Sequence, residues 1–386
     1  MQKLTRRQLL KTGGAAFAAP IFAQAGVQVA HAETMDISKL KRITQKMVAP
    51  PGVPKHELMA TGGPKIVEVR LVVEEKLVTI DGDGTTMWAM TFNGSVPGPM
   101  IVCHQDDYVE LTLVNPESNV LEHNIDLHAS TGALGGAELT HVAPGEEAVL
   151  RFKAVKAGVF CYHCAPGGEM IPLHVVSGMA GTIMVLPRKG LRDANGKSIT
   201  YDKVWHIGEN DYYIPKDADG NYKSYEDLVD SMSDTLEVMH GFIPTHVVLG
   251  GAAFAYTGDN ALKSKVGETV LIVHMQANNP SQPHLIGGHG DYVWADGSFE
   301  SPPREGLETY WLAGGSAGAM IYTFRQPGLY VYLNHNLIKA ILSGAAAHIE
   351  VEGKWDDDLM TAVKEAGPIM GNAQNFPMRS MAPENA

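Results

Sequence analysis

The sequence predicts an all-β protein made of two tandem Greek-key β-sandwich domains. Val, Ile and Thr recur in short runs, and the 41 glycines and 22 prolines supply many tight turns between them. Hydrophobic residues make up 45% of the 386-residue chain and charged residues 19%, which is a globular composition with enough chain for two separate cores. A repeat within the chain indicates two copies of one sandwich.

Several short motifs occur once in each half of the chain. They are Gly158–Tyr162 with Gly328–Tyr332, Ser177–Ala180 with Ser343–Ala346, and the histidine pairs His123/His128 with His284/His289, which are five residues apart in both cases. An alternating strand follows each Ser-Gly motif, and a strand precedes each histidine pair. Two copies of a β-sandwich account for this order.

The motifs divide the chain into successive segments. We expect a signal peptide over residues 1–32, an N-terminal arm over 33–60, a first domain over 61–187, a second domain over 188–353 and a C-terminal tail over 354–386. The boundary between the domains falls near Pro187–Gly190. The polar stretch Lys216–Asp230 is interpreted as an excursion from the second domain, and the tail as a segment that packs on a neighbouring subunit.

The first 32 residues have the features of a twin-arginine export signal. Arg6 and Arg7 precede an uncharged apolar run, Gly13–Ala30, and Ala30-His31-Ala32 provides small residues at the cleavage position. A membrane anchor is the alternative, but Gly, Pro and Gln interrupt the run, and no later stretch is long and apolar enough to span a bilayer. The sequence therefore predicts a periplasmic protein with no membrane partner.

The charge of the chain limits its partners. Removing the export signal takes away four basic residues and no acidic one, which changes the formal net charge from −13 to −17. Such a surface repels nucleic acid and favours a basic protein partner. It does not attract a small anion, so an anionic substrate needs a local positive centre such as a metal ion.

The three cysteines fall into two groups. An exported protein with so few cysteines is not a disulfide scaffold. Cys103 and Cys161 are interpreted as buried apolar residues, and a bridge between them is left open. Cys164 belongs instead to a group of metal-binding residue types.

His123, Cys164, His174 and Met179 have the types and the order of the ligands in a blue-copper site. Two imidazoles and a thiolate form a trigonal site, a weak axial thioether completes it, and sulfur ligands favour copper over hard cations. Met170 is an alternative axial ligand, but it precedes His174. Buried side chains without a metal are the structural alternative, which the combination of these residues in this order disfavours.

Strand geometry separates a second group of histidines from the first. His163 and Cys164 are adjacent, so they point to opposite faces of a strand. His123 and His128 are separated by an odd number of residues and also face opposite ways in an extended segment. If Cys164 and His123 face inward, His128 and His163 form a pair of imidazoles that faces outward. A metal ion at a subunit or domain interface could bind this pair.

A catalytic metal site with three protein ligands keeps one position open. His335 is the candidate for the third ligand. In the repeat, Asn334 takes the place of Cys164 and Ala345 that of Met179, so the second domain lacks the first set of ligands but keeps a histidine at the same edge. An ordinary hydrogen-bonded histidine is the alternative for His335.

Longer motifs around these residues resemble those of the copper-containing nitrite reductases. They are His123–His128 with Gly132–Gly136, Tyr162–Pro166, His174–Met179, Pro283–Asp291 and Asn334–Asn336. The resemblance covers both domains, from roughly residue 60 to residue 353. It implies tandem cupredoxin domains, two coppers in each subunit, and a homotrimer in which the first domain of one subunit faces the second domain of the next.

The resemblance also implies roles for individual residues. The type 1 copper is held by His123, Cys164, His174 and Met179, and the catalytic type 2 copper by His128 and His163 of one subunit with His335 of the neighbouring subunit. Asp126 and His284 lie over the catalytic copper and handle protons, and Ile286 shapes the substrate pocket. Nitrite, an electron and two protons give nitric oxide and water. A basic c-type cytochrome or a small cupredoxin suits the acidic surface as electron donor.

Two other functions compete with this one. A laccase-like multicopper oxidase needs several His-x-His pairs and a His-Cys-His run for its copper cluster, whereas Ala165 follows Cys164 and the sequence contains no His-x-His. A single-copper electron carrier would leave His128, His163 and His335 unexplained. Copper content separates the three functions, because the reductase needs two coppers per chain, the carrier one and the oxidase four.

Overall fold

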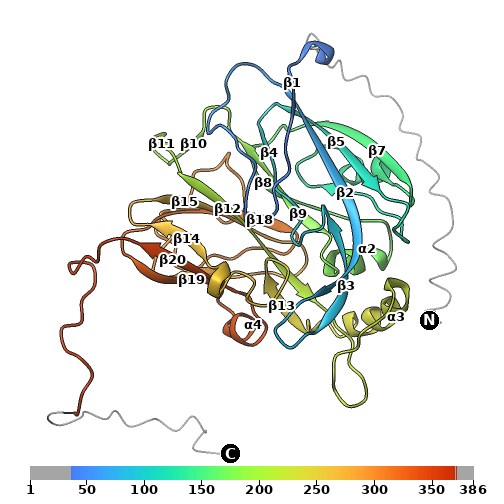
Figure 1. The fold of residues 1–386 in the computed structure, drawn as a ribbon. Helices are drawn as coiled ribbons and strands as arrows, with labels where there is room; N and C mark the ends of the chain where they lie inside the picture. The colour runs from blue at the N-terminus through green and yellow to red at the C-terminus, as the bar shows by residue number, and fades with distance from the viewer. Residues whose placement is uncertain (1–35, 370, 372–386) are drawn as a thin grey trace, which may run out of the picture. The chain divides into compact units, whose positions relative to one another are not determined.

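The computed structural model describes residues 36–369 and 371 of the chain (Figure 1). The predicted signal peptide, residues 1–32, lies outside them. Residues 36–40 belong to a separate N-terminal unit that contains the 3₁₀ turn η1 (Ile37–Lys39), and the chain from Lys41 onward forms the unit described below. Strands dominate this second unit.

The first sandwich consists of two sheets. One has the order β1-β2-β5-β7 with β3 paired to β2, and the other has the order β4-β9-β8-β6. Their strands are β1 (Arg42–Thr44), β2 (Ile66–Thr79), β3 (Thr86–Phe92), β4 (Ile101–His104), β5 (Tyr108–Asn115), β6 (Asp126–Leu127), β7 (Glu146–Lys153), β8 (Gly158–His163) and β9 (Ala180–Leu186). The pairs β1–β2, β2–β5 and β4–β9 are parallel. Parallel neighbours require the chain to cross between sheets, as it does in a Greek-key sandwich.

The second sandwich repeats this plan. Its sheets have the orders β13-β12-β15-β18-β17 and β14-β20-β19-β16, and the latter corresponds strand by strand to β4-β9-β8-β6. Its strands are β12 (Lys203–Tyr212), β13 (His246–Leu249), β14 (Leu262–Lys265), β15 (Thr269–Gln276), β16 (Pro283–Ile286), β17 (Tyr292–Trp294), β18 (Ser316–Thr323), β19 (Gly328–Asn334) and β20 (Ala346–Glu352). A two-stranded sheet of β10 (Leu191–Arg192) and β11 (Ser198–Ile199) precedes it. The predicted fold class, two tandem β-sandwiches, is confirmed.

A shared core joins the two sandwiches. It takes Val159 and Met184 from the first and Leu271 and Ile321 from the second, each at most 2% exposed. Burying one such side chain stabilises the fold by roughly 1.5–3 kcal/mol. β15 is buried along nearly its whole length because one of its faces covers this core and the other covers the core of its own sandwich. The described sandwiches therefore hold each other in place.

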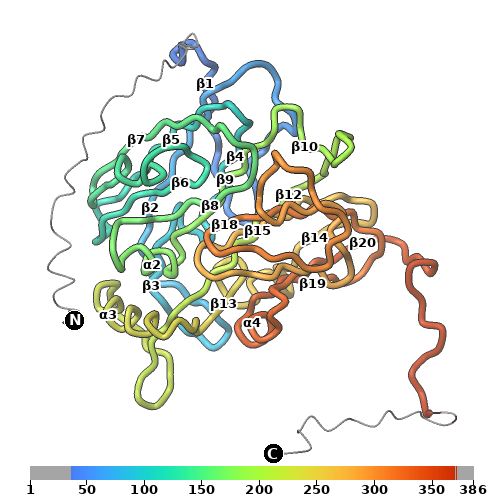
Figure 2. The backbone as a smooth tube through the Cα atoms, turned by 180° about the vertical axis from the view of Figure 1, so that it is seen from behind, coloured from blue at the N-terminus to red at the C-terminus, as the bar shows by residue number. Residues whose placement is uncertain are grey.

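In the described residues from Lys41 onward, helices are few and short. They are α2 (Met170–Val176), α3 (Leu228–Met239) and α4 (Leu337–Leu342), with the 3₁₀ segments η2 (Ala133–Thr140) and η3 (Gly258–Asn260). Figure 2 shows α3 beside α2, and α4 beside β19. None of the helices in the described part of the chain is long and apolar enough to cross a membrane.

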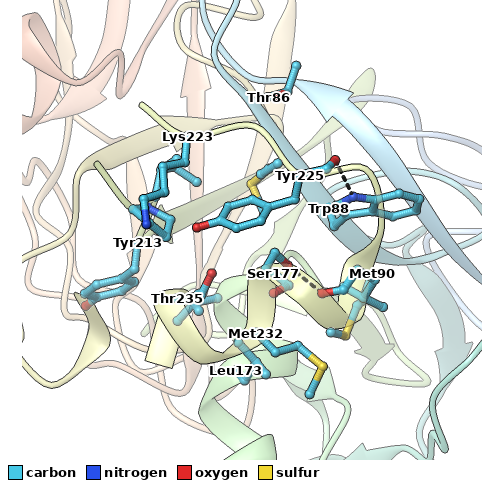
Figure 3. Close-up of a pocket in the computed structure, with 16 residues that line it drawn as sticks. Thr86, Trp88, Met90, Leu173, Ser177, Tyr213, Lys223, Tyr225, Met232 and Thr235 are labelled. Atoms are coloured by element: carbon cyan, nitrogen blue, oxygen red, sulfur yellow. Dashed lines mark hydrogen bonds between the residues drawn. The ribbon is translucent and has the colours of Figure 1, made fainter. Parts of the chain in front are cut away.

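α3 starts inside the stretch predicted as an excursion. Its N-terminus is capped by Asp227, whose side chain accepts a hydrogen bond from the backbone of Asp230. A cavity of about 30 Å³ is lined by residues of α3, such as Thr235, and of the end of α2, such as Ser177 (Figure 3). That volume has room for a single water molecule. α3 thus packs against α2, the helix that carries His174.

Candidate metal centres

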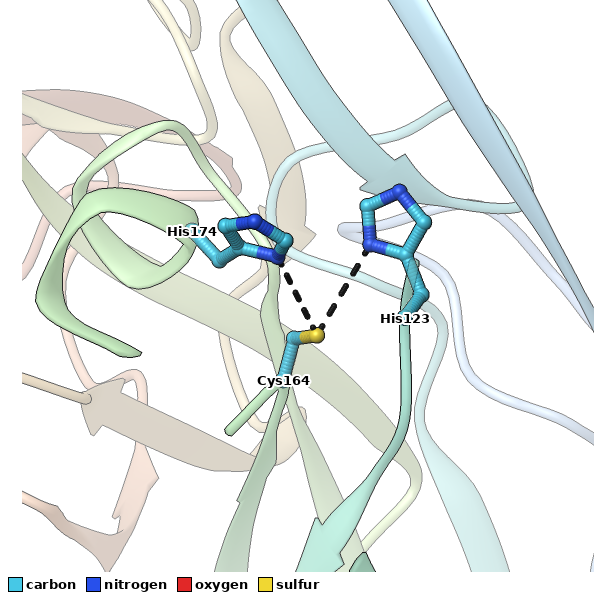
Figure 4. A group of neighbouring side chains, drawn as sticks. All are labelled: His123, Cys164 and His174. Carbon is cyan, nitrogen blue, oxygen red and sulfur yellow. Dashed lines mark hydrogen bonds between the residues drawn. The ribbon is translucent and has the colours of Figure 1, made fainter. Parts of the chain in front are cut away.

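Three buried side chains gather at one end of the first sandwich (Figure 4). His123 precedes β6 and is bridged to Val142, Cys164 directly follows β8, and His174 lies in α2. The Sγ atom of Cys164 lies 3.7 Å from Nδ1 of His123 and 3.3 Å from Nδ1 of His174. All three residues are 0% exposed. The structure thus brings one thiol and two imidazole nitrogens together.

Met179 is buried in the same core as Cys164. Its carbonyl accepts a hydrogen bond from the backbone of Cys164 at 3.1 Å, and its own N–H donates to the carbonyl of His174 at 3.0 Å. Met170, the alternative fourth ligand, begins α2 and is partly exposed. The backbone therefore favours Met179 as the fourth member of the cluster.

The second nitrogen of His123 contacts a carboxylate that sequence reasoning missed. Glu75 in β2 accepts from Nε2 of His123 at 2.9 Å and from the backbone N–H groups of Val120 and Leu121 at 2.7 and 3.0 Å. Burial raises the pKa of Glu75, but these hydrogen bonds outweigh it and lower the pKa overall. A proton on Nε2 leaves Nδ1 available on the side of Cys164.

The electrostatics of the cluster fit a soft metal ion. Burial raises the pKa of the Cys164 thiol to about 12, although hydrogen bonds from the backbone of Asn124 and Ala165 lower it. Burial, and then His123, lower the pKa of His174 to about 3, so this imidazole is neutral near pH 7. A thiolate in this setting needs a cation to offset its charge. Two imidazoles with sulfur are a ligand set for copper.

A second cluster lies on the opposite face of the same strand end. Asp126 in β6 pairs across the sheet with His163, the last residue of β8, and His128 follows β6. The two Nε2 atoms of His128 and His163 are 3.2 Å apart, and Oδ2 of Asp126 is 3.8 Å from Nε2 of His163. Two imidazoles and a carboxylate therefore converge on one point.

Each imidazole of this second cluster also has a backbone partner. Nδ1 of His163 lies 3.0 Å from the carbonyl oxygen of Cys164, and His128 is hydrogen-bonded to the backbone of Gly315. If each ring carries its proton on the nitrogen that bonds the backbone, both Nε2 atoms are hydrogen-bond acceptors and neither can donate to the other. A metal ion between the two Nε2 atoms would then bind both lone pairs. Partial desolvation of the ring, and then His163, lower the pKa of His128 more than Asp126 and Gly315 raise it. Neutral imidazole is the form that binds metal.

The facing of these residues agrees with the strand alternation. His123 and Cys164 are buried, whereas His128 is exposed and His163 is partly exposed. His163 and Cys164 are consecutive, so a single peptide bond joins a member of one cluster to a member of the other.

The second sandwich carries a separate histidine pair. His284 in β16 and His335, just after β19, have ring centroids 4.8 Å apart. Nδ1 of His284 lies 2.9 Å from the carbonyl oxygen of Glu308 and 3.0 Å from Oγ1 of Thr309, and Ile286 is 46% exposed. Within the described part of one chain, His335 is outside the cluster of Asp126, His128 and His163.

Sheet register corrects the pairing of the two histidine motifs. His284 pairs with Leu333 across β16 and β19, whereas Asp126 pairs with His163 across β6 and β8. In the repeat, Leu333 is the equivalent of His163. His284 therefore occupies the position of Asp126 and not that of His123, although the spacing of five residues suggests the latter.

Ser281 takes the position of His123 in the second sandwich. Both residues form an isolated antiparallel bridge with the segment that follows them in the sandwich. The matching hydrogen-bonded pairs are His123–Val142 with Ser281–Leu312, and Cys164–Met179 with Asn334–Ala345. The predicted equivalence of Asn334 with Cys164 is therefore correct.

Cys103 and Cys161 are free and buried. Burial raises the pKa of both thiols. The two residues are packed as small apolar side chains, which agrees with their interpretation from the sequence.

The chain matches two family models, both described as multicopper oxidase, over residues 73–190 and 203–355. The copper-containing nitrite reductase of Rhizobium meliloti (strain 1021) is 57% identical over 369 residues, which are 94% of this chain and 97% of that protein. The copper-containing nitrite reductase of Pseudomonas chlororaphis is 60% identical over 331 residues, which are 86% of this chain and 91% of that protein.

Two solved structures are also similar to this chain. A copper nitrite reductase from Nitrosomonas europaea superposes with a TM-score of 0.61 at 29% identity, covering 76% of this chain and 96% of that chain. A multicopper oxidase superposes with a TM-score of 0.59 at 20% identity, covering 82% of this chain and 96% of that chain. The second likeness shows the fold alone.

Proposed function

Because the chain belongs to the copper-containing nitrite reductases, we propose that it reduces nitrite by one electron to nitric oxide, with two protons converting the second oxygen to water. The observation that carries this proposal is the junction of the two clusters. Cys164 of the buried cluster and His163 of the open cluster are neighbours in the chain. The site where the electron enters and the site where the substrate binds can thus be separate and still be joined by one peptide bond.

His123, Cys164, His174 and Met179 would hold the copper that takes up the electron, and His128 and His163 would hold the catalytic copper. Copper supplies a one-electron carrier at the first position and a Lewis acid for nitrite at the second. The buried cluster excludes water from the thiolate, because its side chains are 0% exposed. The open cluster leaves its Nε2 atoms accessible to a small anion.

Two side chains would move the protons in this proposal. Asp126 is close enough to His163 to hydrogen-bond a ligand at the Nε2 side and to donate a proton to the leaving oxygen. His284 uses Nδ1 for Glu308 and Thr309, which leaves its other nitrogen to orient a water and relay the second proton. Ile286 lies two residues from His284 on the same strand and would shape the wall of the pocket.

The open cluster needs one more ligand, which we propose comes from His335 of the neighbouring subunit in a homotrimer. His335 lies two residues before the start of α4, which carries the apolar residues Leu337, Ile338, Ile341 and Leu342 at 51% to 79% exposure. A second copy of the chain would cover this apolar surface and bring the two half-sites together.

Measuring copper content and nitrite turnover on one copper-loaded sample tests the function. We expect two coppers per chain and release of nitric oxide with a chemical reductant. One copper per chain without release of nitric oxide would contradict the proposal and indicate an electron carrier. Four coppers per chain would indicate an oxidase.

A mixing experiment tests the shared site. The His163→Ala and His335→Ala variants should each be inactive alone. Co-expressed, they should regain part of the turnover, because some interfaces then combine an intact His163 with an intact His335 of another copy. If the mixture stays as inactive as the separate variants, the ligands come from one chain.

We further propose that the protein works in the periplasm after twin-arginine export and receives electrons from a basic c-type cytochrome or a small cupredoxin. The supporting observations are the sequence of residues 1–32 and the acidic charge of the chain. Activity in the periplasmic fraction that is lost on Arg6→Lys, Arg7→Lys would support export. Faster reduction by a basic donor at low salt than at high salt would support the charge match.

A further inference from the structure

The loop over Asp126 has an unusual backbone. Leu134, Gly135 and Gly136 adopt three consecutive left-handed conformations, with φ of 51°, 57° and 93°. The loop follows Asp126 and His128 in sequence and contains the 3₁₀ segment η2 (Ala133–Thr140). A left-handed backbone favours glycine over residues with a Cβ atom. Two of the three positions are glycine, but they do not contact the same side chain.

Gly135 lies directly against the carboxylate of Asp126. A Cβ atom at Gly135 would overlap Oδ1 of Asp126, far inside van der Waals contact. The other oxygen, Oδ2, is the one that lies 3.8 Å from Nε2 of His163. The carboxylate is therefore bounded by the backbone of Gly135 on one side and by the open cluster on the other.

We propose that Gly135 is a positioning residue: the absence of a side chain there leaves the space in which the carboxylate of Asp126 turns toward His163. This inference rests on the proposed proton-donating role of Asp126. A methyl group at Gly135 would overlap the Asp126 carboxylate and would also lie 3.0 Å from the backbone nitrogen of Leu127. The carboxylate is the flexible partner, so it can swing away while the backbone needs only a small shift. The consequence is a displaced proton donor in a folded protein.

Two neighbouring glycines provide matched controls. Gly136 is also left-handed, but a Cβ atom there would meet Cδ2 of Leu150 instead of Asp126. Gly132 has an extended φ of 167°, and a Cβ atom there would have no neighbour within 4 Å. Gly136→Ala therefore tests the combined cost of a left-handed alanine and of a side-chain overlap that does not involve Asp126. Gly132→Ala tests the effect of an added methyl group elsewhere in the same loop.

The experiment compares the three alanine variants with both coppers bound. Gly135→Ala should keep the visible thiolate–copper band and lose roughly 10²-fold in turnover, the size of effect expected from a displacement of about 1 Å in a catalytic group. Its crystal structure should show the Asp126 carboxylate turned away from His163. Gly132→Ala and Gly136→Ala should keep more than about a tenth of the turnover and leave the carboxylate in place.

A double variant shows whether Gly135 acts through Asp126. In an Asp126→Ala background, Gly135→Ala should change turnover and nitrite affinity by less than about twofold, because the group it positions is gone. An equal loss in both backgrounds, or an unmoved carboxylate in the Gly135→Ala crystal, would overturn the inference. A displaced carboxylate together with near-normal turnover of Asp126→Asn would uphold the positioning role and reject the proposed role of Asp126.

Discussion

The two sandwiches use the same end for opposite purposes. In the first, Glu75 bonds only one nitrogen of His123, and the other nitrogen points to a thiol. In the second, Glu209 is fully buried in β12, and its carboxylate accepts from Ser281 Oγ at 2.6 Å and from Asn334 Nδ2 at 2.8 Å. These partners occupy the positions of His123 and Cys164.

The second network continues through aromatic residues. Nε2 of His274 lies 3.4 Å from Oε2 of Glu209, and Nδ1 of His274 lies 3.1 Å from the hydroxyl of Tyr332. Burial raises the pKa of Glu209, but the hydrogen bonds and the charge of His274 outweigh it and lower the pKa overall. The same positions of the duplicated sandwich can therefore hold hydrogen-bond donors to a buried carboxylate or ligands to a metal ion. Three substitutions and a change of pH test this difference between the two sandwiches.

The largest effect should come from removing the thiol of the first sandwich. Cys164→Ala should abolish the visible thiolate–copper band, lower copper from two to one per chain and reduce turnover with a protein donor to background, because the sulfur ligand and the covalent connection are lost. Absorption spectroscopy, copper analysis and nitrite turnover measure these outcomes. A band that persists would show that Cys164 is not the ligand.

Removing the carboxylate of the second sandwich should affect stability more than colour. Glu209→Ala leaves three buried partners without an acceptor and should lower the free energy of unfolding by about 3–5 kcal/mol. Chemical denaturation of the copper-loaded protein measures it. Glu209→Gln keeps an oxygen for Asn334 and should lose less; a loss of under about 1 kcal/mol in Glu209→Ala would contradict the role of the network.

Acid should act on the second sandwich even when copper is bound. Burial, and then His274, lower the pKa of His206 to about 3, and its Nε2 lies 2.8 Å from Oγ1 of Thr182. The unfolded chain takes up this proton below about pH 6.5. Stability from His206 is thus present above pH 6.5 and is lost as pH falls toward 3, by about 1.4 kcal/mol per pH unit.

Unfolding free energies between pH 7 and pH 4 measure this loss. His206→Gln should be less steeply destabilised by acid than the parent chain, by up to one proton in the slope. Parallel curves for the two proteins would show that His206 does not carry the acid sensitivity.

The smallest effect should come from the carboxylate of the first sandwich. Glu75→Gln replaces an acceptor of three hydrogen bonds with an amide, and should weaken copper binding at the buried cluster by about tenfold, or about 1.4 kcal/mol. The visible band should shift but remain. Competition with a chelator measures the affinity, and an unchanged affinity would remove Glu75 from the support of His123.

Short sequence patterns predict those features of the structure that depend on residues close together in the chain. The opposite facing of His163 and Cys164 follows from strand alternation, and the two sandwiches follow from a repeat of short motifs. The helix α2 around His174 was not predicted, because Pro172 is a poor helix signal, although the first turn of a helix tolerates it. The polar sequence at the start of α3 likewise indicates only an excursion and not a helix.

Long-range partners were beyond the sequence. Glu75 is 48 residues from His123, and Glu209 is 72 residues from Ser281 and 125 from Asn334. Nothing in the local composition connects such positions, since β2 and β12 bring them into place only when the sheets form. The position of His284 was misjudged for the same reason, because sheet register and not spacing decides which residues correspond.

The consecutive placement of His163 and Cys164 has a consequence for how the molecule tolerates change. Two consecutive Cα atoms are about 3.8 Å apart in any folded protein. Heating, substitution of core residues or a shift of one sandwich against the other can alter side-chain packing. None of these changes the length of the peptide link between His163 and Cys164. The environment of each cluster is therefore free to vary between relatives, while the backbone step between the two clusters stays the same.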